Sequence, residues 1–129
     1  MKDKTLLIRV NKPAQEVFEF TLNPVNTPKW LDSVVKEEIN ESPVKKGTQY
    51  RNQNTQGVWG EYTMKEFKKN EMFEWTKSDN NYHVRYTFKP IDENTTELEY
   101  YEWVEEGELD EPFTLEILQK LKSTLESMK

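Results

Sequence analysis

Hydrophobic and polar positions alternate along most of the chain, which is the spacing of β-strands rather than of helices. The clearest example is YHVRYTF at residues 82–88, where Tyr82, Val84, Tyr86 and Phe88 share one face and histidine, arginine and threonine the other. The same spacing predicts strands at 5–10, 34–41, 48–53, 58–67, 72–76 and 96–104. Short polar turns separate most of them, so we expect an antiparallel meander.

Two segments change to helical spacing. After Pro13, a good first-turn residue, apolar side chains recur at helical intervals through residues 14–21. An acidic, proline-bearing stretch at 108–112 leads into a second stripe, which predicts a helix of about four turns. This stripe consists of Leu115, Leu118, Leu121, Leu125 and Met128, with Ile117 beside it. Its partner should be the apolar face of the meander.

Two stretches carry a resemblance to a known superfamily. IRVNKPAQEVFEFTLNPVNTPKWLDSV (8–34) and YTFKPIDENTTELEYYE (86–102) resemble the START-like (SRPBCC) superfamily, which includes the birch pollen allergen, START domains and polyketide cyclases. The matching positions are Ile8, Val10, Pro13, Val17, Phe18, Pro24, Trp30 and Val34, then Phe88, Pro90, Thr96 and Leu98.

The resemblance implies the α+β helix-grip fold as a single domain over residues 1–129. We expect a curved antiparallel sheet of six or seven strands wrapped around a long C-terminal helix, with two short helices between the first two strands. Many relatives bind lipids, sterols or polyketides between sheet and helix, others are enzymes, and others bind proteins. Fold alone therefore leaves function open.

The inward face of the predicted sheet is rich in aromatic rings. The chain has 6 Phe, 4 Trp and 6 Tyr but only 34% hydrophobic residues, so rings must fill much of its core. Because side chains alternate between the two faces of a strand, we expect Met64, Phe73 and Leu98 to point inward together with several tyrosines and a tryptophan. These rings either close a packed core or line a pocket. The candidate ligand-binding residues are Trp30, Tyr50, Tyr62, Trp75, Tyr82, Tyr86, Phe88 and Tyr100. The resemblance places Trp30 on the second short helix, at the end where relatives admit ligand.

Catalytic chemistry has few candidates. There is no cysteine, and the single histidine, His83, is expected to be exposed, so we predict no metal site, no cofactor and no nucleophilic triad. Glu37 and Glu102 share parity with inward-facing residues, and a carboxyl group in an apolar pocket can serve as acid or base. Alternatively, each is a strand-end glutamate near solvent.

The net charge and the hydropathy of the chain limit the kinds of partner that we expect. The net charge of −6 disfavours nucleic acid, and no stretch is apolar enough for membrane insertion, so a cytoplasmic protein, monomeric or weakly dimeric, is expected. We predict binding of a small hydrophobic or aromatic molecule (lipid, sterol or polyketide-like) without catalysis. The alternatives are a cyclase, dehydrase or hydrolase that uses a cavity carboxylate, and a co-chaperone-like interaction module presenting Tyr101 and Trp103.

Overall fold

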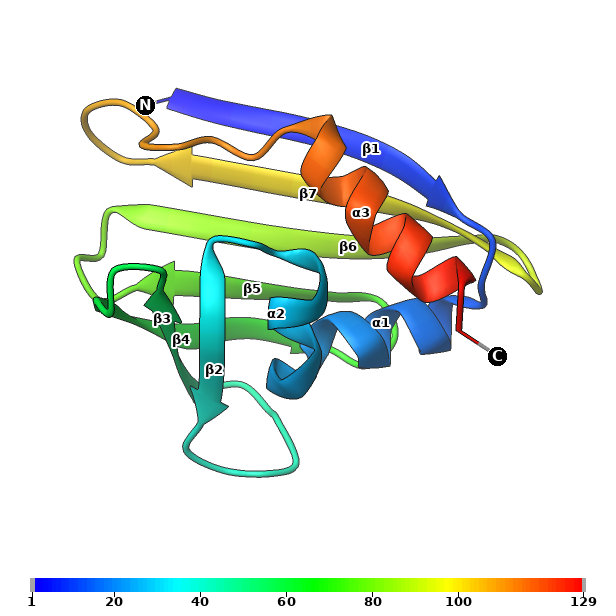
Figure 1. Ribbon diagram of the computed structural model, residues 1–129, viewed down its shortest axis with the longest axis horizontal. Helices are drawn as coiled ribbons and strands as arrows, with labels where there is room; N and C mark the ends of the chain where they lie inside the picture. The colour runs from blue at the N-terminus through cyan, green and yellow to red at the C-terminus, as the bar shows by residue number, and fades with distance from the viewer. Residues whose placement is uncertain (1, 129) are drawn as a thin grey trace.

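A computed structural model describes residues 2–128 as one seven-stranded antiparallel sheet with helices against one face (Figure 1). The strands are β1 (Lys2–Val10), β2 (Val34–Ile39), β3 (Gln49–Asn54), β4 (Trp59–Lys68), β5 (Met72–Lys77), β6 (Tyr82–Asp92) and β7 (Thr95–Val104). The helices are α1 (Ala14–Leu22), the 3-10 helix η1 (Pro24–Asn26), α2 (Thr27–Trp30) and α3 (Leu115–Glu126). The predicted helix-grip fold is confirmed.

The sheet order is β1-β7-β6-β5-β4-β3-β2, so consecutive strands from β2 to β7 are neighbours and β1 closes the edge beside β7. In Figure 1, α3 runs across β1, β7 and β6. Helix α2 packs against β2, and α1 packs against β6 and β7. The alternation in β6 is confirmed, because Val84, Tyr86 and Phe88 are all buried. The core therefore lies between the concave face of the sheet and these helices.

The C-terminal helix is shorter than the stripe of leucines predicted. It begins at Leu115, where the Oγ1 of Thr114 accepts a hydrogen bond from the N–H of Ile117, and spans 12 residues. Leu118, Leu121 and Leu125 are buried against the sheet. Leu115 and Met128 lie at or beyond the ends of the helix, and the expectation that they join the buried stripe was wrong: they are 43% and 48% exposed.

Two strands depart from the expected pattern for local reasons. A register shift between Val34 and Lys36 leaves Val35 opposite no partner. Val34 is therefore buried and Val35 is exposed, although Val35 has the same strand parity as Glu37, which was predicted to face inward. β6 does not end at Pro90 but continues to Asp92. Beyond Phe88 it pairs with β7 alone, and a proline is tolerated where one strand edge is free.

Candidate functional site

A small chamber lies between the concave face of β2–β7, the helices α1 and α2 and the segment just before α3. Its volume is about 80 Å³. Its wall consists of Thr21, Thr27, Trp30, Leu31, Glu37, Tyr50, Asn52, Tyr62, Trp75, Tyr82, Val84, Tyr86, Tyr100 and Phe113. All the aromatic residues proposed from the sequence are therefore gathered in one wall, except Phe88.

Phe88 belongs to the closed end of the core. Its ring packs edge-on against Phe18 of α1, with 5.3 Å between ring centroids, and lies 5.5 Å from Phe73. It shares a strand face with Tyr86, but α1 covers this end of the strand. Sequence parity places both residues inward and says nothing about which helix lies above each.

A wider vestibule adjoins the chamber. Its volume is about 360 Å³, and it shares Leu31, Asn52, Tyr62, Tyr82 and Phe113 with the chamber wall. The vestibule is bordered by the β3–β4 hairpin, the β5–β6 turn and the segment that leads to α3. The chamber thus forms the inner end of a space whose outer part opens at one end of the sheet.

Among residues 2–128, Glu37 is the only carboxylate in the chamber wall, and no lysine, arginine or histidine lines it. The hydroxyl of Thr27 donates a hydrogen bond to its Oε1 at 2.6 Å, and the Nδ2 of Asn52 lies 3.5 Å from its Oε2. Burial raises the pKa of Glu37 to about 7, although these two hydrogen bonds oppose the rise. Near neutral pH this group is therefore able either to give or to take a proton.

Glu102, the second candidate carboxylate, does not line the chamber. It is 1% exposed, and its Oε1 accepts hydrogen bonds from the hydroxyls of Tyr82 at 2.7 Å and Tyr100 at 3.2 Å. Its Oε2 accepts from the backbone N–H of Phe113 at 2.9 Å. The ring of Phe113 then stacks on Tyr100, with centroids 4.2 Å apart. Glu102 therefore holds the segment before α3 against the sheet.

Trp30 is both a core residue and part of the chamber wall. It lies on α2 as expected, is 2% exposed like a core residue, and also lines the chamber. Its Nε1 and that of Trp75 are buried without a hydrogen-bond partner in the part of the chain that the structure describes. Buried indole N–H groups usually have an acceptor. Both tryptophans line the chamber, so their indole rings would contact a ligand held there.

Several wall residues were not identified from the sequence, among them Asn52, Thr27 and Phe113. Asn52 shares parity with Tyr50 on its strand, and that signal places it inward. Thr27 and Phe113 lie on a one-turn helix and on an irregular segment, where no periodicity is available. Their positions follow from tertiary contacts, namely the bonds to Glu37 and Glu102.

The outer face of β6 and β7 is more covered than predicted. The side chain of His83 is only 14% exposed, so the expectation of an exposed histidine was wrong. It stacks on Trp103 at 4.7 Å, and its Nδ1 lies 2.9 Å from the hydroxyl of Thr76. Tyr101 and Trp103 face outward as expected but are half-buried, stacked on each other at 5.0 Å.

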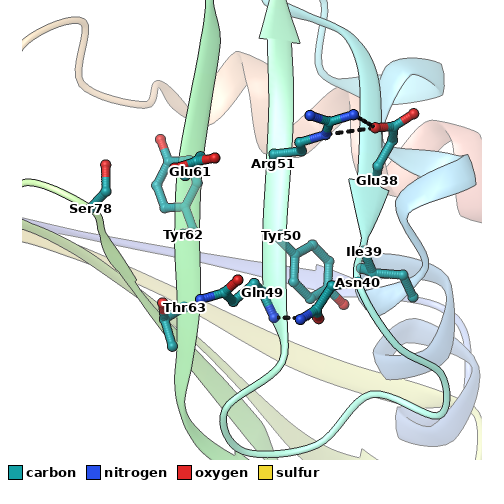
Figure 2. A pocket seen from close by; sticks show the side chains of 10 residues that line it. All are labelled: Glu38, Ile39, Asn40, Gln49, Tyr50, Arg51, Glu61, Tyr62, Thr63 and Ser78. Atoms are coloured by element: carbon teal, nitrogen blue, oxygen red, sulfur yellow. Dashed lines mark hydrogen bonds and ion pairs between the residues drawn. The ribbon is translucent and has the colours of Figure 1, made fainter.

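A second hollow lies on β2, β3 and β4 (Figure 2), with a volume of about 360 Å³. The Nε of Arg51 donates to the Oε1 of Glu38 at 2.7 Å, and the N–H of Gln49 donates to the Oδ1 of Asn40 at 2.9 Å. These polar groups already satisfy one another, unlike the indole groups of the chamber. The chamber and vestibule are therefore the stronger candidate site.

Two general features limit the chemistry. Within residues 2–128, no group of three or more histidine, aspartate or glutamate side chains is placed to hold a metal ion. No helix in the same range combines the length and apolar character needed to cross a membrane.

A curved sheet that grips a C-terminal helix around an aromatic chamber defines the class of START-like helix-grip proteins. More particularly, residues 4–129 match the family described as "Polyketide cyclase / dehydrase and lipid transport", and the chain belongs to this family. Family and fold together support a domain that binds a hydrophobic ligand. No curated protein matches the sequence.

Solved structures share the fold at low sequence identity. The protein XoxI from Bacillus cereus is 15% identical, with a TM-score of 0.77 over 97% of this chain and 96% of that one. A START superfamily protein from Mycobacterium smegmatis is 18% identical, with a TM-score of 0.74 over 97% of each chain. The Aha1 dimer from Colwellia psychrerythraea is 13% identical, with a TM-score of 0.68 over 98% of this chain and 97% of that one.

Proposed function

We propose that this protein binds a small, mostly apolar molecule, with one end in the chamber and the remainder in the vestibule. The observation that carries the proposal is the chamber itself, whose wall is mostly aromatic. It includes two tryptophans whose buried indole N–H groups have no hydrogen-bond partner in residues 2–128. Rings supply apolar contact area, and a few polar groups fix the orientation of a ligand.

The volumes narrow the range of ligands. Pockets for drug-sized ligands measure roughly 300–1,000 Å³, so the chamber of about 80 Å³ accommodates only a short group. The vestibule of about 360 Å³ has room for the rest of a small molecule. A lipid chain or a slender aromatic polyketide is compatible with this shape, whereas a sterol requires the chamber to widen.

Binding without chemical change is the function that we favour. The carboxyl group of Glu102 already accepts three hydrogen bonds, which leaves Glu37 as the one carboxyl group among the described residues of the wall. A general acid or base must lie within hydrogen-bond reach of the proton that it transfers. Glu37 has only Thr27 and Asn52 as hydrogen-bond partners, and both hold it in place.

An acid–base enzyme of the cyclase or dehydrase kind is the second candidate, because the pKa of Glu37 is raised to about 7 inside the chamber. If the protein is such an enzyme, the Glu37→Gln variant will retain ligand binding but convert none of the ligand. Mass spectrometry of the ligand after incubation with each protein tests this directly. Recovery of an unchanged ligand from the wild-type protein supports binding alone.

We expect Trp75→Ala and Tyr86→Ala each to weaken ligand binding at least tenfold, because both rings form the chamber wall. Trp75→Phe keeps most of the ring but removes the N–H, and should weaken only ligands that offer an acceptor. An amide NMR titration with fatty acids, flavonoids and polyketide-like aromatics supplies the measurement.

Trp103→Ala is the matched control, since this ring lies on the outer face of the sheet next to His83. Its affinity should equal that of the wild type. Unchanged affinity in both chamber variants would place the ligand outside the chamber and refute the proposed site.

A further inference from the structure

The entrance to the site is acidic. Asp79, Glu108, Asp110 and Glu111 border the vestibule, and Lys77 is the one basic residue in its lining. Hydrogen bonds from backbone N–H groups, the first of them from Asn81, lower the pKa of Asp79, so it is charged at neutral pH. A cleft lined by one sign of charge concentrates small ions of the opposite sign. Lys2 offsets one of these charges, because its Nζ lies 3.9 Å from Glu108.

The chamber beyond this entrance has the composition of a cation site. Of the described residues that form its wall, eight are aromatic, one is a carboxylate, and none is basic. The faces of tryptophan and tyrosine rings attract ammonium groups, most strongly where water is excluded. An aromatic wall without a carboxylate would suit any apolar group, whereas the carboxylate adds a preference for positive charge.

Within residues 2–128, no basic side chain forms an ion pair with Glu37. The groups that face it are Thr27 of α2, Asn52 and Tyr50 of β3, Tyr62 of β4 and Tyr86 of β6. The three tyrosines are neutral at physiological pH, because burial raises the pKa of Tyr62 to about 12 and those of Tyr50 and Tyr86 further. When Glu37 is ionised, its charge is therefore unpaired, and a bound cation would supply the missing partner.

We infer that the ligand is a small organic cation whose ammonium group occupies the chamber, between the aromatic rings and the carboxylate of Glu37. This inference rests on the proposed function and specifies the charge of the ligand. The short chamber admits an alkylammonium head group, and the indole ring of Trp30 forms part of the wall around it. A fatty acid, in contrast, would bring its carboxylate toward Glu37 with no basic residue in the chamber wall to compensate.

Three probes of nearly equal shape separate charge from apolar contact. Choline carries a quaternary ammonium group, 3,3-dimethylbutan-1-ol is its neutral counterpart, and 3,3-dimethylbutanoate is an anion of similar size. At about pH 8, where Glu37 is mostly ionised, we expect choline to shift the amide NMR signals of the chamber strands and to bind at least tenfold more tightly than the alcohol. The anion should bind most weakly of the three.

Two variants in β2 test which carboxyl group causes the preference for choline. Glu37→Gln should remove the preference for choline over the alcohol, whereas Glu38→Gln should retain it, because Glu38 lies on the outer side and pairs with Arg51. Equal or tighter binding of the alcohol by the wild type would overturn the cation inference and leave the proposed function standing. If none of the probes shifts these signals, the inference fails, and the proposed function then depends on the titration with neutral aromatics.

Discussion

Replacement of Glu102 by alanine should lower the free energy of unfolding by about 3 kcal/mol, because a buried acceptor is lost and its donors remain. The hydroxyls of Tyr82 and Tyr100 and the N–H of Phe113 all donate to this carboxyl group. Because Glu102 is 1% exposed, its removal leaves a cavity in the core beside these unpaired donors. Chemical denaturation followed by far-UV circular dichroism measures the loss.

Two further variants make the comparison specific. Glu99→Ala changes an exposed glutamate on the same strand, and its stability should stay within about 0.5 kcal/mol of the wild type. Glu102→Gln keeps an oxygen for the tyrosines but turns an N–H₂ group toward the N–H of Phe113, so its loss should be intermediate. Equal stability of the Glu102→Ala and Glu99→Ala variants would show that Glu102 does not anchor the segment before α3.

The sheet was predictable because alternation is a local property of each strand. β6 illustrates this: residues two apart point to one face whatever packs there. The predictions of side-chain burial were wrong where a neighbouring element determines which face a residue lies on or whether it is covered. The bulge at Val35 depends on pairing with β3, and the exposure of Leu115 depends on where α3 begins relative to the sheet.

The sequence predicts which residues of the site face inward, but it does not predict the empty volume between them. Glu37 and Glu102 have the same parity with respect to inward-facing residues, yet only Glu37 borders the chamber. The difference comes from partners that are far away in the sequence. Tyr82, Tyr100 and Phe113 donate hydrogen bonds to Glu102 and enclose it. Glu37 accepts a hydrogen bond from Thr27 and otherwise borders the chamber. A sequence pattern contains no information about how much room remains between such elements, and this is why a packed core and a pocket were indistinguishable.

We expect Glu37 to dominate the pH dependence of the free energy of unfolding. Its pKa is raised from the ordinary value of 4.5 to about 7, so between these values the folded protein holds a proton that the unfolded chain has released. The contribution of Glu37 is therefore complete below about pH 4.5 and is lost as the pH rises through about 7. The difference between the two pKa values corresponds to about 3 kcal/mol.

Glu37→Gln removes this dependence, since glutamine resembles the protonated form at every pH. We expect the variant to match the wild type near pH 4.5 and to be more stable by about 3 kcal/mol above pH 8, in urea denaturation series run at each pH. Glu38→Gln is the control of opposite sign: a hydrogen bond from Arg51 lowers the pKa of Glu38, so its removal should give no stabilisation at high pH. Parallel stability curves for Glu37→Gln and wild type would mean that Glu37 is solvated, and the chamber would then lack the unpaired charge on which cation selectivity depends.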